Sequence, residues 1–95
     1  MEVKPTLLRA DGVSQPIEPK NGTNFTRDEL EALVGGVFEQ HRIANDTGYI
    51  FSDRDAKEKK KKFNDEATLV YCLWHGFMDS IHGDAVICPK EMILW

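Results

Sequence analysis

The chain has little of what defines several large protein classes. Two cysteines among 95 residues cannot form the disulfide framework of a small secreted domain, so we expect reduced thiols in a cytoplasm. No segment approaches the roughly 18 consecutive apolar residues of a membrane-spanning helix. Residues 1–5 contain no basic segment followed by an apolar run, so we expect no signal peptide. The sequence therefore predicts a cytoplasmic protein without a membrane anchor.

Positive charge is scarce outside one segment. The formal net charge is −4, but residues 54–62 contain six basic and two acidic residues, which leaves −8 on the rest of the chain. Non-specific nucleic-acid binding needs several phosphate contacts on one face, and one basic loop on an acidic body supplies few. We therefore keep weak nucleic-acid binding through the Lys57–Lys62 loop only as an alternative. Lys57, Lys59 and Lys60 remain candidates for holding a small nucleotide-like ligand or a phosphate group, although a solvated loop is the more common explanation of such a run.

The sequence also lacks the common catalytic and cofactor motifs. It contains no Asp-x-Asp-x-Asp-Gly calcium loop and no Gly-x-Gly-x-x-Gly or Gly-Lys-Ser/Thr phosphate loop. Gly35 and Gly36 follow a predicted helix rather than opening one, so their amides are not placed to cradle a phosphate. We expect a protein that is not an enzyme and that binds no metal or cofactor.

The segment from Phe25 to Gly36 predicts a short helix with both ends encoded. Thr26 and Glu29 have the spacing of a capping box, and Phe25 and Leu30 have that of a hydrophobic staple. Gly35 supplies the left-handed residue that ends many helices. The helix is expected over residues 27–34.

The remaining pattern predicts one α+β domain over residues 1–95. A second helix is expected from Asn64, its N-cap, with Phe63 as its staple. Its apolar stripe at helical spacing consists of Ala67, Val70, Tyr71, Trp74 and Phe77. Asp11-Gly12 indicates a hairpin turn, and Pro16 indicates an edge strand. Strands are expected within residues 3–9, 13–18, 37–43, 49–51 and 85–88. The order is ββαββαβ: a largely antiparallel sheet of hairpins, with two short helices packed on one face.

At this point the chain resembles a known family. Residues 30–39, with Val34-Gly35-Gly36, the Asn-led start at residues 64–68 and the strand behind Gly83 are similar to a family of small phage, plasmid and bacterial proteins. That family is named only as a domain of unknown function, number 3846. The basic loop before Asn64 departs from the family pattern. The resemblance implies this fold and a mobile-element origin, and it implies no established activity.

Cysteine and histidine residues suggest one alternative. Two thiolates and two imidazoles can form a tetrahedral zinc site, or a Cys–His pair can act as a nucleophile. The structural interpretation is that the cysteines are small core residues and the histidines lie on the surface. The residues in question are Cys72, His75, His82 and Cys88.

The aromatic and soft apolar residues of the C-terminal third indicate a binding surface. A domain of this size does not easily bury both Trp74 and Trp95, and exposed aromatic residues mark interfaces. We expect a phage or mobile-element accessory protein that inhibits a host defence or regulatory protein. Its contact would be with a host protein, or with a second copy of the chain as a homodimer. Acidic residues would compete for a nucleic-acid-binding groove on such a target. The candidate partner-binding residues are Trp74, Phe77, Met78, Trp95, Glu31 and Glu39.

Overall fold

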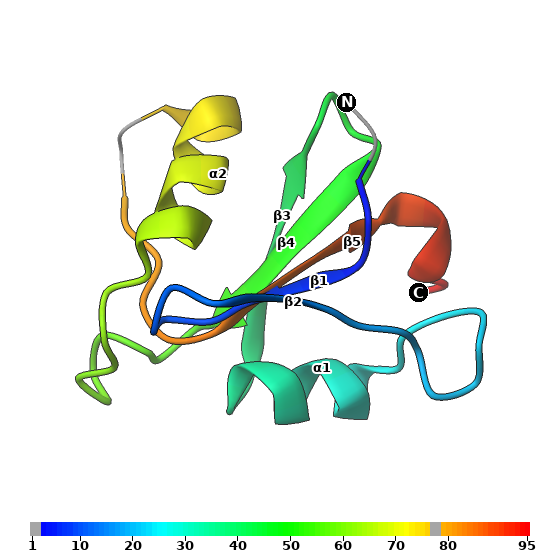
Figure 1. Cartoon of the computed structure of the whole chain (residues 1–95), viewed down its shortest axis with the longest axis horizontal. Coiled ribbons are helices and arrows are strands. Elements are labelled where there is room, and N and C mark those ends of the chain that lie inside the picture. The colour runs from blue at the N-terminus through cyan, green and yellow to red at the C-terminus, as the bar shows by residue number, and fades with distance from the viewer. Residues whose placement is uncertain (1–2, 77–78) are drawn as a thin grey trace.

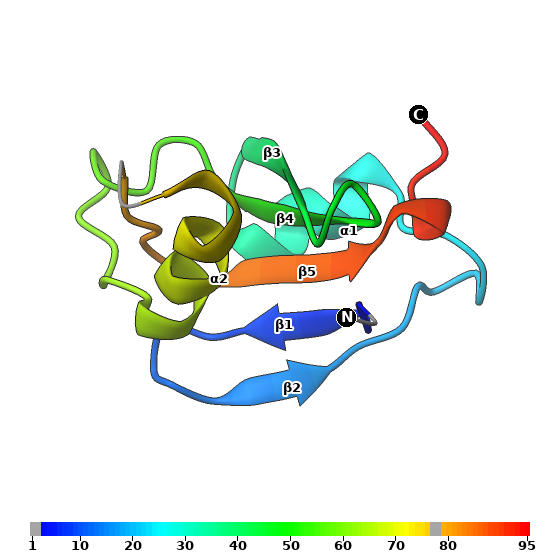
Figure 2. The ribbon, with the colours of Figure 1, turned by 90° about the horizontal axis from the view of Figure 1, so that it is seen from above.

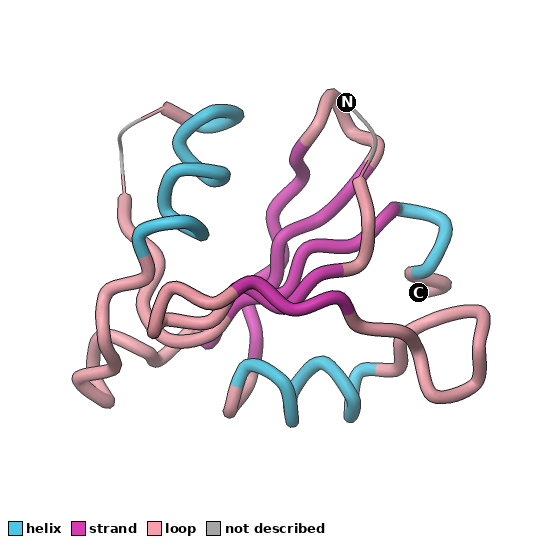
Figure 3. The backbone as a smooth tube through the Cα atoms, in the orientation of Figure 1, coloured by secondary structure: helices cyan, strands magenta, loops and turns pink. Residues whose placement is uncertain are grey.

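The chain folds into one antiparallel sheet with a helix on each of its two faces (Figure 1). The computed structural model describes residues 3–76 and 79–95. Two helices, α1 (Arg27–Val34) and α2 (Asp65–His75), and a short 3₁₀ turn, η1 (Lys90–Met92), accompany the strands (Figure 3). In the described residues, no helix has the length and apolar character that crossing a bilayer requires.

The five strands lie side by side in the order β2-β1-β5-β4-β3 (Figure 2). Every neighbouring pair is antiparallel. The predicted α+β class and the predicted ββαββαβ order are confirmed, and β5 inserts between the two hairpins. The strands are β1 (Thr6–Leu8), β2 (Ser14–Pro16), β3 (Phe38–Ile43), β4 (Gly48–Asp53) and β5 (Ala85–Pro89).

Helix α1 forms as the sequence predicts. The Thr26 hydroxyl accepts from the Glu29 amide at 3.2 Å, and the Glu29 carboxylate accepts from the Thr26 amide at 3.1 Å, which completes the capping box. Phe25 and Leu30 are both fully buried in one cluster. Gly35 ends the helix in the left-handed conformation, with φ at 83°.

The expectation that both helices pack on one face of the sheet is wrong. Neighbouring side chains of a strand point to opposite faces, and Ile50 and Phe51 of β4 enter two different apolar clusters. Phe51 packs with Leu30 and Val34 of α1, whereas Ile50 packs with Ala67 of α2. Both faces therefore need a cover, and each helix covers one.

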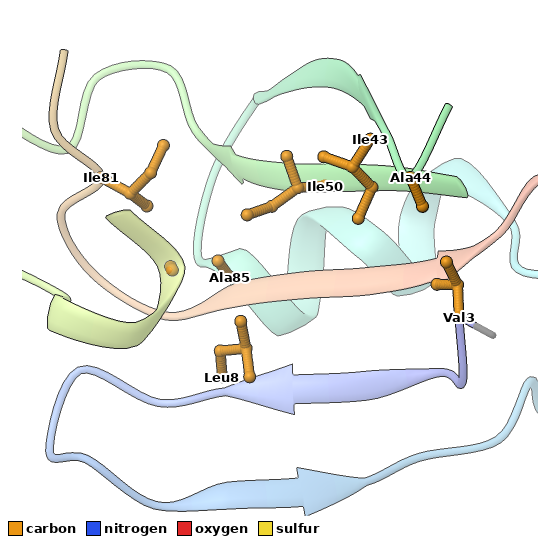
Figure 4. Close-up of a cluster of buried hydrophobic side chains, with 8 residues drawn as sticks. Val3, Leu8, Ile43, Ala44, Ile50, Ile81 and Ala85 are labelled. Atoms are coloured by element: carbon orange, nitrogen blue, oxygen red, sulfur yellow. The ribbon is translucent and has the colours of Figure 1, made fainter. Parts of the chain in front are cut away.

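The cluster beneath α2 is built from small and aliphatic side chains. Its members come from β1, β3, β4 and β5, from α2 and from the segments beside them, and most of them are labelled in Figure 4. Val70, Tyr71 and Trp74 of the predicted apolar stripe pack against this cluster and are half-buried. Its buried members are Val3, Leu8, Ile43, Ala44, Ile50, Ala67, Ile81 and Ala85.

Asn64 fixes the start of α2 and is almost fully buried. Its side-chain oxygen accepts from the Ala67 amide at 3.0 Å, which is the predicted N-cap. Its side-chain nitrogen donates to the Leu8 carbonyl at 2.8 Å and to the Gly83 carbonyl at 2.9 Å. Phe63 is not a buried staple: it is 42% exposed, and its ring lies 5.6 Å from that of His82.

Candidate functional site

Two lysines of the basic segment, residues 54–62, form ion pairs and hydrogen bonds within the protein. Lys59 and Lys61 place their Nζ atoms 2.8 and 2.7 Å from Oδ2 of Asp53, whose side chain is fully buried. Lys61 Nζ also donates to the Val34 carbonyl at 3.0 Å, and Lys59 Nζ to the Gly35 carbonyl at 3.2 Å. These carbonyls close α1, where the helix dipole favours a positive charge. Both lysines therefore cap α1 from a distant loop.

Asp53 is strongly acidic in this setting. Burial raises the pKa of its carboxyl, but hydrogen bonds from Lys59 and Lys61 and from the Asp55 amide outweigh burial and lower the pKa to about 2. Gly36 makes the close approach feasible, because a Cβ there would lie 2.5 Å from Lys59 Nζ and 3.0 Å from Asp53 Oδ1. The second glycine of the Gly-Gly pair thus leaves room for this ion cluster, while its amide donates to the Glu31 carbonyl at the helix end, at 3.0 Å.

The three lysines predicted to hold a ligand have different surroundings. Lys57 forms an ion pair with Asp79, and the hydrogen bond from Lys57 lowers the pKa of the Asp79 carboxyl. Lys59 belongs to the Asp53 cluster. Lys60 is exposed and has a left-handed backbone, with φ at 58°. The structure therefore does not bring the three together as one phosphate-binding group.

A small polar cleft lies on the α2 face, between β3, β4 and the residues that follow α2. Its volume is about 90 Å³. The His41 ring packs edge-on against Tyr71 at 5.0 Å, and Glu39 Oε2 lies 3.5 Å from His41 Nε2. Three acidic residues line it, Glu39, Asp53 and Asp79, with the basic residues Arg54 and Lys57. Its lining includes Glu39, His41, Ser52, Arg54, Lys57, Tyr71, Asp79, Ser80 and His82.

The same cleft contains a serine–histidine contact that sequence reasoning missed. Ser80 Oγ lies 3.0 Å from His82 Nε2, and His82 Nδ1 lies 3.2 Å from the Lys61 carbonyl. A proton on Nδ1 would leave Nε2 to accept from the hydroxyl, the arrangement of an activated nucleophile. However, about 90 Å³ holds only a few water molecules, while ligand pockets are typically about 300 Å³ or more. The cleft is too small to enclose a nucleotide-like ligand.

The cysteines and histidines of the zinc alternative do not converge. Cys88 lies in the cluster beneath α1, while Cys72 belongs to α2 on the opposite face. His75 stacks on Tyr71 at 4.8 Å, and His82 packs against Phe63. In residues 3–76 and 79–95, no group of three or more metal-ligating side chains comes together. Burial and then Glu91 raise the pKa of the Cys88 thiol to about 12, so this thiol stays protonated.

The C-terminal residues form an aromatic and cationic stack on the α1 face. The Arg27 guanidinium lies 5.0 Å from the Trp95 ring and 5.8 Å from the Phe38 ring. The Trp95 and Phe38 rings are 6.2 Å apart, and Trp95 Nε1 donates to the Gln40 side chain at 3.4 Å. Trp95 remains 43% exposed and Leu94 71% exposed. We call Arg27, Phe38, Leu94 and Trp95 the Trp95 surface.

The predicted partner-binding residues do not form one surface. Trp95 lies on the α1 face, whereas Trp74 and Glu39 lie on the α2 face, where Glu39 lines the cleft. Trp74 is half-buried, and its indole N–H is buried without a hydrogen-bond partner in the described residues. Glu31 is a half-buried residue of α1. Phe77 and Met78 lie outside the described residues.

Sequence reasoning missed several residues of these surfaces. Arg27 and Phe38 join Trp95 only through tertiary packing, because 57 or more positions separate them from it. Leu69 and Leu73, one turn apart on α2, are 58% and 65% exposed. Their four-residue spacing was a readable signal for an apolar strip outside the core stripe.

Comparisons of the chain with protein-family models, with curated proteins and with solved structures find no match. The assignment of function therefore depends on the chemistry of these surfaces.

Proposed function

We propose that this protein is a non-enzymatic binding protein that contacts a partner protein through the Trp95 surface. The observation that carries the proposal is the Arg27–Trp95 stack: an exposed tryptophan held by a guanidinium at 5.0 Å, with an exposed leucine beside it. Tryptophan and arginine are the residue types that dominate binding energy at protein interfaces. Stacking also fixes the Trp95 ring before binding, so less side-chain freedom is lost on association.

The burial of the tail supports this interpretation. Ile93 is 8% exposed and anchors the segment in the cluster beneath α1, whereas Leu94 and Trp95 extend out of it. Leu94 is mostly exposed, and Trp95 rests on Phe38 and Phe51, with ring centroids 6.2 and 6.5 Å apart, while 43% of it stays exposed. Leu94 and Trp95 are therefore apolar surface, held in place by Ile93, that a partner protein can bury.

The biological setting comes from the resemblance. The chain resembles small phage and plasmid proteins of the family with number 3846. This resemblance suggests an accessory protein that acts in the cytoplasm of a bacterial host. The partner would be a host protein, and the function would be inhibition of a defence or regulatory system. The charge of −8 outside residues 54–62 suits a target with a basic surface. Lys57, Lys59 and Lys61 already form ion pairs within the chain, so a nucleic-acid partner is less favoured.

Site-specific photo-crosslinking tests the proposal directly. A photoreactive phenylalanine analogue replaces Leu94 in one sample and Val13 in a control, since both residues are exposed but Val13 lies outside the Trp95 surface. In host cells, the probe at 94 should capture one discrete protein, and Arg27→Ser with Trp95→Ser should abolish the capture. Equal capture by both probes, or capture that survives the double substitution, would overturn the proposal.

A further inference from the structure

The two edges of the sheet are built differently. The Arg9 amide donates to the Val13 carbonyl at 3.0 Å and the Ile17 amide to the Pro5 carbonyl at 3.2 Å. Odd-numbered residues of β2 therefore face β1, and Ser14 and Pro16 direct their backbone outward. Pro16 has no N–H to offer there, and β2 is only three residues long. Short edges with an outward proline resist pairing with another strand.

The β3 edge has no such protection. The Arg54 amide donates to the Val37 carbonyl at 2.9 Å, so Val37, Glu39, His41 and Ile43 face β4. By alternation, the backbone groups of Phe38, Gln40 and Arg42 point outward. The Arg42 carbonyl is met by His75 Nε2 at 2.6 Å, and it retains a second lone pair. The strand has six residues and no proline.

We propose that β3 pairs antiparallel with β3 of a second copy of this chain, about a twofold axis at Gln40. In this register Gln40 faces Gln40 of the second copy, Glu39 faces His41, and Phe38 faces Arg42. The outward backbone groups of positions 38, 40 and 42 then face one another, as hydrogen bonding across an antiparallel pair requires. The two five-stranded sheets become one continuous sheet of ten strands.

Charge selects this register from its neighbours. Moving the axis by one residue toward the N-terminus places Glu39 opposite Glu39, which is unfavourable for like charges directly across a strand pair. Moving it by one residue toward the C-terminus places His41 opposite His41 and loses both acid–imidazole pairs. Only the axis at Gln40 matches Glu39 with His41 twice, on the α2 face.

The pairs on the α1 face are also complementary. Arg42 is 71% exposed in its side chain, and its ion pair with Asp46 is loose, at 3.9 Å. Across the axis it can lie against the Phe38 ring, as Arg27 already does from within the chain at 5.8 Å. A twofold contact of this kind is isologous, so every favourable pair occurs twice.

Pairing would also arrange the Trp95 surface. Trp95 donates to Gln40, so two copies of Trp95 would flank the twofold axis on the same face of the ten-stranded sheet. The pairing itself does not depend on the proposed function, because it needs no other protein. It would present two Trp95 surfaces side by side to a partner.

Sedimentation equilibrium of the purified full chain tests the pairing, with circular dichroism to verify that each variant folds. The wild type should be dimeric at about 100 µM, a concentration that detects even weak association. His41→Glu places a carboxylate opposite Glu39 twice and should raise the dissociation constant roughly tenfold. Glu39→Lys combined with His41→Glu places opposite charges at the two facing positions and should bring the constant back toward the wild-type value.

Proline variants provide the matched control. Gln40→Pro removes an outward N–H of β3 and should abolish the dimer, whereas Ser14→Pro alters the equivalent outward position of β2 and should leave it intact. A monomeric wild type at about 100 µM would overturn the inference and leave the edge to an extended segment of another protein. So would failure of the charge-exchanged double variant to recover, or an equal effect of the two proline variants.

Discussion

The two faces of the sheet are covered by different means. Beneath α1, Phe25, Leu30 and Phe51 are all fully buried, and large side chains fill the space. Beneath α2, alanines and aliphatic residues take their place, and polar groups are buried among them, including Asn64 and Ser52. The α1 face is thus closed by apolar packing with the Asp53 ion cluster at the end of the helix, and the α2 face by a combination of packing and hydrogen bonds beside a polar cleft.

This difference shows how two short helices can be held in different ways. Neither α1, with eight residues, nor α2, with eleven, is long enough to be stable alone. Helix α1 is capped at its start by its own neighbours and at its end by two lysines. Helix α2 depends on one buried asparagine that also joins it to β1 and to the loop before β5.

The largest effect is expected from removing the aromatic residue at the centre of the α1 face. Phe51→Ala should lower the free energy of unfolding by about 4 kcal/mol, since it removes a fully buried ring. Its neighbour Ile50 points to the other face, and Ile50→Val should lower it by about 1 kcal/mol. Urea denaturation of the two variants measures both. A loss below about 2 kcal/mol for Phe51→Ala would mean that the α1 face is not closed by packing.

The two N-caps allow a second comparison. Asn64→Ala should lower the free energy of unfolding by about 3 kcal/mol, because it removes the cap and the two buried hydrogen bonds that the Asn64 side chain donates to the Leu8 and Gly83 carbonyls. Thr26→Ala removes an exposed cap and should lower it by about 1 kcal/mol. Thermal unfolding with calorimetry provides the values. Equal losses would show that Asn64 acts only as a cap.

Acid should weaken the α1 end of the molecule in particular. The folded pKa of Asp53 is about 2, below the ordinary 3.8, so its contribution is present above about pH 4 and is lost as the pH falls toward 2. Lys59 and Lys61 are partly exposed, so solvent reduces the contribution to about 1–2 kcal/mol. Asp53→Asn should lack this part of the acid dependence. If the free energy of unfolding falls with pH in parallel for wild type and variant, Asp53 does not contribute to the acid dependence.

The smallest effect is expected on the outer side of α2. Leu69→Ser and Leu73→Ser should each change the free energy of unfolding by no more than about 0.5 kcal/mol, because both side chains are mostly exposed. Val70→Ser, one residue away and packed against the core cluster, is the control and should destabilise clearly. Chemical denaturation of the three variants decides whether the outer strip contributes to the fold.

Local signals account for the parts of the fold that were predictable. The Thr26–Glu29 box, the Gly35 end and the Asn64 cap each depend on residues within four positions of one another. Pro16 correctly indicated an edge strand, since a proline is tolerated only where its missing N–H faces outward. The spacing of Leu69 and Leu73 also indicated an apolar strip on α2. The prediction considered only the stripe of α2 that packs against the core.

The candidate surfaces could not be predicted in the same way. The partner-binding set divided between two faces because the side-chain direction of each strand, and hence the face of each helix, depends on register. The lysine run suggested a ligand site because nothing nearby in the sequence shows that Asp53 is buried beneath the end of α1. Trp95 was a candidate contact residue from the sequence, but its contacts with Arg27 and Phe38 could not be read from it.

By itself the sequence determined the elements and their order, because capping, turn and periodicity signals act over a few residues. Tertiary structure alone decided that β5 inserts between the hairpins and that β3 becomes the open edge, because strand pairing joins residues as far apart as Leu8 and Ala85. It also decided which face of the sheet each helix covers, and that Lys59 and Lys61 form ion pairs with Asp53. Each of these depends on which distant groups meet, and the energies that select them are those of burial and pairing rather than of local conformation.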